Sequence, residues 1–443
     1  MPVSEKEFFM SNSSLRPSFT PNRWVIAIAA FILQLALGSV YAWSVFLKPV
    51  AALYYNTTVA HVSKTQQGAT NLTFSIVLLA LGITAAFGGY FQNRFGPRAV
   101  ATAGGILYGL GIILAGLTTS AHNLFLLYLT FGILGGIGIG LAYIVPLAML
   151  IRWFPDRRGF ITGLAVAGFG LGAILIAQTA PPLLKSTSLG VASTFIYLGI
   201  AYLIIVVVAS QFFRRAPDNY APVGWTPSAV QKATQTRRDY TLPEALRDPK
   251  WYVLWLILAL NVTAGAAVIS VASPLAQKFT GVNELTAAII VSVISIFNGA
   301  GRLFWAWLSD AIGRPFTFLA IFLVQIVAFL ALAQIGLGGF GVLLLPAAII
   351  GLCYGGGFGT MPAFAADFFG AKNSGTIYGA MLTAWSAGGI IGPILISSIE
   401  YHTALYIIAG IMLVSCALPL VARILVRRQS QSDALQVPVG VSK

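Results

Sequence analysis

The chain has 443 residues, of which 58% are hydrophobic and only 9% are charged, and its net charge is +14. Soluble globular domains carry about 25% charged residues. The composition therefore excludes an ordinary soluble enzyme or binding domain and predicts an integral membrane protein whose first partner is the lipid bilayer. The positive charge does not indicate a nucleic-acid partner, because nearly all of it lies in short segments between apolar runs.

Twelve apolar runs follow one another along the chain, and a helix needs about 20 apolar residues to cross a bilayer. The predicted fold class is an all-α membrane protein with twelve transmembrane helices. The expected spans are 23–47, 72–92, 99–119, 123–151, 160–182, 193–213, 251–279, 285–308, 315–335, 340–368, 374–399 and 403–425.

Basic residues gather on one side of the predicted membrane. The tails and connections on that side hold 21 of the 26 lysines and arginines, the other side holds four, and Arg302 lies inside a span. Basic residues favour the cytoplasmic side, so we expect both termini in the cytoplasm, as an even number of spans requires. We predict a multi-pass protein of the plasma (inner) membrane that functions as a monomer.

A polar, basic segment at 214–250 divides the spans into two groups of six. The predicted parts are a cytoplasmic tail (1–22), an N-terminal six-helix bundle (23–213), a cytoplasmic linker (214–250), a C-terminal six-helix bundle (251–425) and a second cytoplasmic tail (426–443). The end of the linker, "DYTLPEALRDPKW", predicts a short amphipathic helix with Thr241 as its cap.

The two groups of spans repeat each other. Gly96 follows the second span and Gly313 follows the eighth, at an offset of 217 residues. A second set of glycines repeats at an offset of 216: Gly159, Gly163 and Gly172 match Gly375, Gly379 and Gly388. Because these two sets of glycines repeat at nearly the same offset, the sequence predicts an internal duplication. Such a duplication predicts two pseudo-symmetric bundles around a site near the midplane of the membrane.

The stretch "WLSDAIGRP" resembles the signature of the major facilitator superfamily (MFS) between spans eight and nine. Within that superfamily, four stretches resemble the oxalate/formate antiporter family and the related monocarboxylate transporters: "QLALGSVYAWSVF", "DYTLPEALRDP", "ISIFNGAGRL" and "DFFGAKNSGTIYG". The resemblance extends from Asn22 to about Arg427. It implies the MFS fold and a transporter of small organic anions.

Both copies of this signature loop are candidate gate loops on the cytoplasmic side. The residues concerned are Asp310, Gly313 and Arg314 in the second half, and Gly96 and Arg98 in the first. The first copy carries Asn93 where the family has an acid. This departure weakens the charge relay that the resemblance implies between the two halves.

Arg302 is the candidate substrate residue. Counting 1.5 Å per residue from Asp310 places it roughly 12 Å into the membrane, near the centre of a hydrocarbon core about 30 Å thick. A charge there costs about 2.5–3.5 kcal/mol. Two ordinary explanations are a side chain that snorkels to the surface and a structural ion pair. All twelve acids, however, lie in tails, connections or span ends, so we predict that an anionic substrate is the partner.

A guanidinium suits a carboxylate because its planar fork binds both oxygens. Asn298, one turn before Arg302, lies on the same helical face, and Ser295 continues that face. Asn298 is therefore predicted to bind the carboxylate or to orient the arginine. Proton-coupled relatives of the family often carry an acid at the Asn298 position, and asparagine cannot titrate.

Polar and aromatic residues inside other spans complete the predicted pocket. The candidates are Gln34, Tyr41, Tyr143, Tyr354 and Trp385. A tyrosine hydroxyl can donate to a carboxylate while its ring lies against a small organic chain. The alternative is that these aromatic residues pack between helices or form the interfacial belt, where Trp43 and Phe46 are expected.

The resemblance also bears on the substrate. Oxalate-exchanging relatives pair the span-eight arginine with a lysine in span eleven, whereas Trp385 stands near that place here. One cation and a bulky ring favour a small monocarboxylate such as lactate or pyruvate. The predicted mechanism is alternating access, with any proton carried by the substrate. An oxalate/formate-type exchanger and a non-transporting carboxylate sensor remain alternatives.

An enzyme is not expected. The sequence has no nucleotide-binding motif, no metal-ligand cluster and no buried acid/base pair. We accordingly predict no cofactor and no metal.

Overall fold

The computed structural model describes residues 22–185, 190–217, 220, 222, 239–334, 338–370 and 373–425. The predicted tails, apart from Asn22, and most of the predicted linker lie outside the described residues. Within them the secondary structure is helical throughout, without strands, and twelve helices are long and apolar enough to cross a membrane. The predicted fold class is confirmed.

The first half contains six spans, some of them built from two helices in line. They are α1 (Arg23–Gly38) with α2 (Trp43–Tyr54), α3 (Lys64–Phe95), α4 (Pro97–Leu117), α5 (Leu124–Leu127) with α6 (Gly136–Trp153), α7 (Arg158–Leu171) with α8 (Ala173–Lys185), and α9 (Gly190–Ser210).

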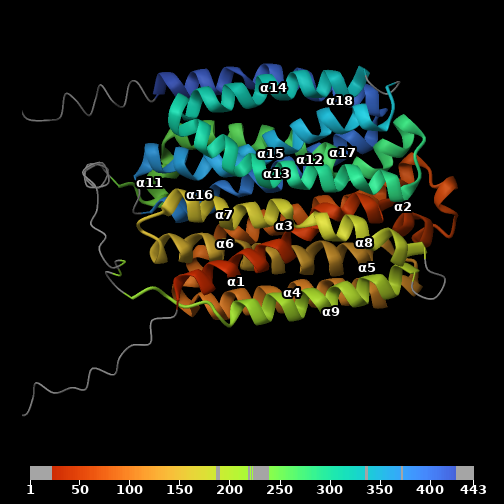
Figure 1. The fold of residues 1–443 in the computed structure, drawn as a ribbon, viewed down its shortest axis with the longest axis horizontal. Helices are drawn as coiled ribbons and strands as arrows, with labels where there is room; N and C mark the ends of the chain where they lie inside the picture. Colours follow the sequence, from red (N-terminus) through yellow and green to blue (C-terminus); the bar gives the residue numbers. More distant parts are fainter. Residues whose placement is uncertain are drawn as a thin grey trace, which may run out of the picture.

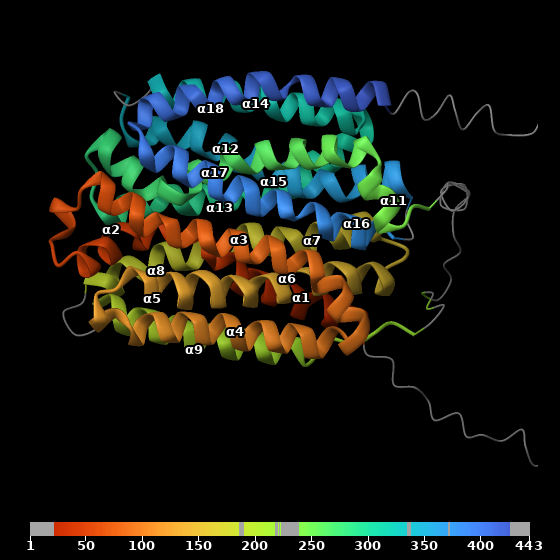
Figure 2. The same ribbon diagram turned by 180° about the vertical axis from the view of Figure 1, so that it is seen from behind.

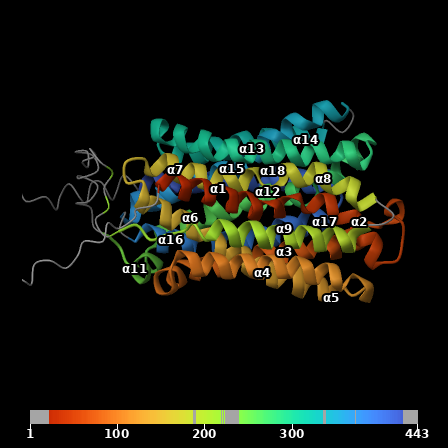
Figure 3. The same ribbon diagram turned by 60° about the horizontal axis from the view of Figure 1, so that its bottom comes forward.

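The second half repeats this layout. Its spans are α12 (Pro249–Thr280), α13 (Glu284–Ile312), α14 (Arg314–Gln334), α15 (Phe340–Phe369), α16 (Ser374–Met381) with α17 (Thr383–Ser398), and α18 (Tyr401–Ser415), whose span continues to Leu425. The short helix α11 (Leu242–Arg247) precedes α12 and forms where the sequence predicts it. The Thr241 backbone N–H donates to Glu244 Oε2 at 2.8 Å, and α11 lies at the same end of the bundle as α16 (Figure 3).

The two halves lie one above the other in Figure 1, with the second half on top. The paired helices α4 and α9 form one outer edge and α14 and α18 form the other, as the view from behind also shows (Figure 2). Between the halves, α3 packs along α16 and α17, and α13 packs along α7 and α8. The first and last described residues lie at the same end of the bundle, which we call the terminal end.

The equivalent loops of the two halves share an unusual backbone geometry. Gly96 ends α3 with φ 87° and ψ 159°, and Gly313 ends α13 with φ 86° and ψ 149°. A positive φ of this size with an extended ψ suits glycine and strains residues with a Cβ. The same turn at positions 217 residues apart supports the predicted duplication.

The boundaries of several spans differ from the prediction because polar residues extend the helices beyond the apolar runs. The largest change is in α3, which begins at Lys64 instead of the predicted 72. Ser63 caps this helix: its Oγ accepts from the Gln66 backbone N–H at 3.2 Å, and Gln66 Oε1 accepts from the Ser63 backbone N–H at 2.8 Å. A reciprocal cap stabilises the first turn without any apolar contribution.

The prediction that Trp43 and Phe46 form an interfacial belt is wrong. Trp43 is 2% exposed and Phe46 is 5% exposed. The Trp43 indole N–H donates to Asn71 Oδ1 at 3.2 Å, and its ring lies 5.2 Å from that of Phe131. An indole whose N–H has a hydrogen-bond partner packs as well between helices as at the membrane–water interface. Composition alone does not distinguish these two locations.

Glycines let α13 and α15 approach each other closely. A Cβ at Gly355 would overlap the carbonyl oxygen of Asn298, and one at Gly359 would overlap the carbonyl oxygen of Arg302. Small residues at such crossings allow backbone contact between membrane helices. These glycines therefore hold the segment Asn298–Arg302 at a fixed depth and rotation against α15.

A methyl group at this crossing should destabilise the protein. We expect Gly359→Ala to cost about 1–3 kcal/mol, because α13 must move away from α15. Gly341→Ala, on the same helix, is the control, since a Cβ there would meet nothing within 4 Å. Melting temperatures of the purified proteins measure the difference. Equal melting temperatures for the two variants would mean that the contact is not as close as described.

Candidate functional site

Arg302 is completely buried in α13, and its guanidinium lies between two aromatic rings. Its Cζ is 5.6 Å from the ring centre of Phe169 in α7 and 5.1 Å from that of Phe358 in α15. Arg302 Nε donates to Asn298 Oδ1 at 3.3 Å, as expected for residues one turn apart. The two rings come from different halves, so the arginine lies at the interface between them.

The charge of Arg302 is not balanced by a protein anion in the described part of the chain. Its Nη1 and Nη2 atoms are buried without a hydrogen-bond partner, and it forms no ion pair with the described residues. The Nδ2 atom of Asn298 is likewise buried and unpartnered. Buried donors are normally paired, and cation–π contacts, worth about 2 kcal/mol or more each when desolvated, supply no hydrogen-bond acceptor for the N–H groups. The site therefore has at least two guanidinium donors and one amide donor available for an anion.

A chain of hydrogen bonds crosses from one half to the other beside this arginine. The Trp385 indole N–H donates to the Tyr354 hydroxyl at 3.1 Å, and the hydroxyls of Tyr354 and Tyr41 share a hydrogen bond of 3.0 Å. Tyr41 belongs to a short 3₁₀ turn, Ser39–Ala42, that joins α1 to α2. Separation of the two halves at this level must break the bond between the tyrosines.

Tyr143 and Gln34 lie on the first-half side of the site. The Gln34 Nε2 donates to the carbonyl oxygen of Tyr143 at 3.0 Å, which fixes α1 against α6. The Tyr143 hydroxyl is buried near the Arg302 guanidinium, and among the described residues no hydrogen bond of regular geometry reaches it. The Tyr143 ring makes edge contacts with Phe169 at 5.1 Å and Trp385 at 5.2 Å. Of these two predicted site residues, Tyr143 offers its hydroxyl to the site, whereas Gln34 uses one amide N–H between helices and keeps a buried Oε1 without a partner among the described residues.

The structure thus brings Asn298, Arg302, Tyr41, Tyr143, Tyr354 and Trp385 together around one point. Sequence reasoning missed Phe169, Phe358 and Tyr378. Phe358 could have been found, since it follows Tyr354 by one turn on the same face. Tyr378 gives a similar signal, since it precedes the candidate Trp385 by two turns. Phe169 gives none, because phenylalanine is common in such spans. The Tyr378 hydroxyl is buried near Tyr143 and Arg302, and no hydrogen bond of regular geometry reaches it from the described residues.

The site is closed in this structure. A small cavity of about 10 Å³ lies beside Asn298 and is lined by Tyr41 and Ser295 among others. That volume is comparable to what one water molecule needs, so a carboxylate requires the site to open. On the terminal side of Arg302, the Leu303 side chain lies against Gly163 and α16 packs on α3.

The end opposite the termini, which we call the distal end, is closed by charged residues from both halves. Glu400 accepts from Lys278 at 2.5 Å and lies 3.8 Å from Lys64 of α3. Lys185 of α8 pairs with Glu284 of α13 at 3.2 Å. The pairs Lys64–Glu400 and Lys185–Glu284 join the two halves at the distal end and must separate if the site opens there, whereas Lys278 holds Glu400 from within the second half.

Replacing Glu400 should loosen the distal end. The hydrogen bond from Lys278, with the nearby positive charges, holds the pKa of Glu400 below its ordinary value. Ionised Glu400 therefore stabilises the closed distal end fully above its ordinary pKa. This stabilisation is lost only as the pH falls through the lowered pKa, so the effect of Glu400 on closure should not change between about pH 5 and 8. We expect Glu400→Gln to raise the fraction open at the distal end about twofold to fivefold, since the pairs are half exposed.

Distances between spin labels at Ala60 and Thr403, one in each half, measure this opening. Glu244→Gln, at the terminal end, is the control and should leave the distances unchanged. A distance distribution of Glu400→Gln identical to that of the wild type would contradict the role given to the distal pairs.

The candidate gate loops make contacts within their own halves. Arg314 pairs with Asp310 at 2.6 Å and with Asp367 at 3.4 Å. Arg98 Nη2 donates to the carbonyl oxygen of Gln211 at 2.7 Å. Each loop therefore ties neighbouring helices of one half together, and the described residues show no ion pair between the two loops.

Two similar six-helix halves that meet around one buried arginine define the class of this molecule, a multi-pass membrane protein built like a transporter. The profile of the Major Facilitator Superfamily matches residues 24–393, and the chain belongs to that superfamily. Its relatives and its fold are those of transporters, which confirms that it is not an enzyme.

Three relatives span most of the chain. The "Uncharacterized MFS-type transporter YhjX" of Escherichia coli (strain K12) is 32% identical over 377 residues, covering 84% of this chain and 87% of that protein. The oxalate:formate antiporter of Oxalobacter formigenes is 29% identical over 402 residues, covering 90% of each. Monocarboxylate transporter 13 of Rattus norvegicus is 24% identical over 408 residues, covering 88% of this chain and 86% of that protein.

A solved structure supports the fold alone. The crystal structure of a D-xylose-proton symporter aligns with a TM-score of 0.69 at 14% identity, covering 89% of this chain and 97% of that one. The resemblance to the oxalate/formate antiporter and monocarboxylate transporter groups is confirmed by the relatives described above.

Proposed function

We propose that this protein carries small organic anions across the plasma (inner) membrane and that its substrate is a monocarboxylate of the size of lactate or pyruvate. The observation that supports this most strongly is the fully buried Arg302, whose Nη1 and Nη2 atoms have no partner among the described residues. A carboxylate accepts two parallel hydrogen bonds from such a fork. The relation to an oxalate:formate antiporter and to a monocarboxylate transporter points to the same substrate class.

The surroundings of Arg302 favour one carboxylate with a small apolar tail. Phe169 and Phe358 lie against the guanidinium, and the Trp385 ring packs on both of them, with centroid distances of 5.4 Å and 4.5 Å. Rings of this kind bind a methyl group or a short carbon chain well. They provide no second cation, which a dicarboxylate such as oxalate requires for its other charge.

The proposed mechanism is alternating access between the two bundles, 23–213 and 251–425, joined by the linker 214–250. The substrate neutralises Arg302, which lowers the cost of closing a dry site around a charge. Tyr41 and Tyr354 then re-form their bond across the interface. No carboxylate lies beside Arg302 among the described residues, so a co-transported proton travels on the substrate. The gate loops with Gly96, Arg98, Asp310, Gly313 and Arg314 hold the terminal ends of the helices within each half.

The proposed orientation places the terminal end in the cytoplasm. Basic residues outnumber acids there, in agreement with the positive-inside preference. The proposed functional unit is a monomer, because one chain supplies both halves of the site.

An oxalate/formate-type exchanger is the second candidate, since the Oxalobacter formigenes antiporter is similar over 90% of the chain. Uptake by liposomes that contain the purified protein separates the two proposals. Labelled lactate should enter, and unlabelled pyruvate should compete at least about tenfold better than oxalate, a difference of about 1.4 kcal/mol. Stronger competition by oxalate would replace the first proposal with the second, and no uptake of either acid would overturn both.

A further inference from the structure

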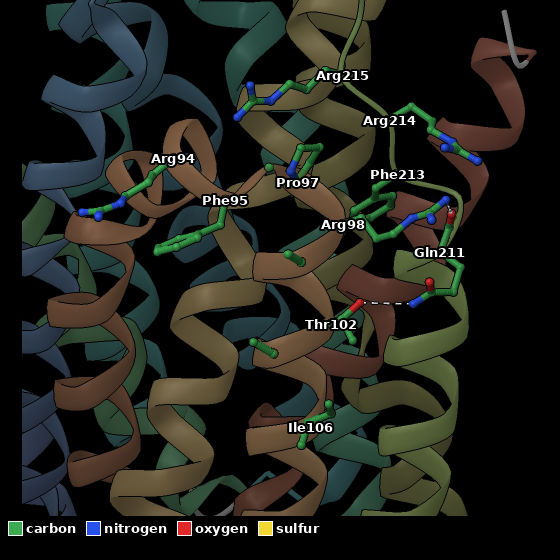
Figure 4. A pocket seen from close by; sticks show the side chains of 13 residues that line it. Arg94, Phe95, Pro97, Arg98, Thr102, Ile106, Gln211, Phe213, Arg214 and Arg215 are labelled. Atoms are coloured by element: carbon green, nitrogen blue, oxygen red, sulfur yellow. Dashed lines mark hydrogen bonds between the residues drawn. The ribbon is translucent and has the colours of Figure 1, made fainter.

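A second cavity, far larger than the one beside Asn298, lies at the terminal end of the first half (Figure 4). Its volume is about 800 Å³, and it lies between the start of α4 and the segment that follows α9. Four arginines line it: Arg94, Arg98, Arg214 and Arg215. The general preference for basic residues on the cytoplasmic side does not explain why four of them gather around one cavity.

Two of the four arginines are held in place by backbone carbonyl groups. Arg98 Nη2 donates to the carbonyl oxygen of Gln211 at 2.7 Å. Arg215 Nη2 donates to the carbonyl oxygen of Gln92 at 3.1 Å and also contacts that of Asn93. Carbonyl groups position a guanidinium but leave its full charge, so the cavity wall stays positively charged.

The other two arginines are more loosely held. Arg94 Nη1 donates to the Tyr90 hydroxyl at 3.1 Å, and Arg94 lies over the Phe95 ring at 5.5 Å. Arg214 is exposed on the far side of the cavity in Figure 4. Within the described ranges, none of the four forms an ion pair with a carboxylate.

The equivalent loop of the second half shows what the first half lacks. There Arg314 is neutralised by Asp310 at 2.6 Å and Asp367 at 3.4 Å. The residue equivalent to Asp310, 217 positions earlier, is Asn93. The first half therefore has arginines beside this turn, Arg94 and Arg98, without the acid at position 93, which leaves room for an anion from outside the chain.

The cavity continues into an apolar surface that faces outward from the bundle. Four side chains of α4 repeat at helical spacing along this surface with exposures of 37% to 59%: Ile106, Leu110, Leu114 and Leu117. Ile106 also lines the cavity. The arginine-lined cavity thus leads into an apolar stripe about one membrane leaflet long. This arrangement matches a molecule with an anionic head and a hydrocarbon tail.

We propose that this cavity binds the headgroup of an anionic phospholipid, with an acyl chain along α4. Basic pockets at the cytoplasmic boundary attract such headgroups, and guanidinium forks bind phosphate oxygens bidentately. The N-terminus of α4, which follows Gly96, opens at the cavity and adds a partial positive charge. The lipid would brace α4 against the end of α9 at the outer edge of the first half, independently of the substrate at Arg302.

Native mass spectrometry of the full-length protein in detergent, with lipids of matched acyl chains, tests this proposal. The wild type should retain phosphatidylglycerol about tenfold more strongly than phosphatidylethanolamine. Arg94→Gln/Arg214→Gln should reduce phosphatidylglycerol retention about tenfold, because each arginine near the surface contributes to lipid attraction. Ala103→Trp, which fills the cavity and keeps every charge, should reduce it too.

The control is Arg152→Gln/Arg423→Gln, which removes the same charge outside the cavity and should not change retention. Equal losses in this control would mean general surface attraction and would overturn the site. Full retention by Ala103→Trp, or displacement of the lipid by inorganic phosphate at equal concentration, would overturn it as well. Melting temperatures without added lipid verify that each variant is folded.

Discussion

The Arg302→Gln variant should take up lactate or pyruvate at least about 30-fold more slowly than the wild type while it still folds and inserts. Removing one member of a buried charge pair costs about 2–5 kcal/mol, and each 1.4 kcal/mol corresponds to a factor of ten. Glutamine fills a similar volume and keeps an amide near Asn298. The fold should therefore tolerate the change, because a buried uncompensated charge is removed from the substrate-free protein.

Two variants make this result specific. Arg302→Lys keeps the charge but loses the planar fork and its position between the rings of Phe169 and Phe358, so we expect only partial uptake. Arg423→Gln is the matched control, since Arg423 also lies over a ring, that of Phe316 at 4.4 Å, but away from the site. Uptake near the wild-type rate in Arg302→Gln liposomes would refute the role of this arginine.

The second large effect is expected from Trp385→Lys, which should shift the preference from monocarboxylates towards oxalate by at least about tenfold. The Trp385 indole packs against Phe358, Phe169 and Tyr143. A lysine there would place a second cation beside Arg302 and remove the ring that accommodates an apolar tail. Two like charges repel strongly in a dry site, so only a ligand with two carboxylates compensates both.

Competition between lactate and oxalate in liposome uptake measures this shift. Trp385→Phe retains a ring and should keep the monocarboxylate preference, although the hydrogen bond to Tyr354 is lost. If Trp385→Lys prefers lactate as strongly as the wild type does, the ring does not determine the substrate.

Much of the fold could be predicted from the sequence because the bilayer restricts the possible structures so severely. Each span must be long, apolar and helical, and the offset between Gly96 and Gly313 revealed the duplication. Arg302 was recognisable for the same reason, since charges are rare at such depth. These signals depend on composition and spacing along the chain, which need no knowledge of packing.

The rest of the site depends on contacts between distant segments, which the sequence does not encode locally. Tyr41 and Tyr354 were separate candidates in the sequence, but their mutual hydrogen bond across 313 residues could not be predicted from it. The rings of Phe169 and Phe358 were not predicted as neighbours of Arg302, because apolar residues in spans have many equivalent packing roles. The closed state of the site follows from how the two halves meet, and no single helix determines it.

The most direct test of the account is binding of lactate and pyruvate to the purified protein, measured as the shift in melting temperature over a range of ligand concentrations. Binding to the folded state raises stability by an amount that grows with ligand concentration relative to Kd. We predict a concentration-dependent rise for the wild type and none for Arg302→Gln. An equal rise in both proteins would contradict Arg302 as the carboxylate site, and no rise in the wild type with any small carboxylate would contradict the proposed substrate class.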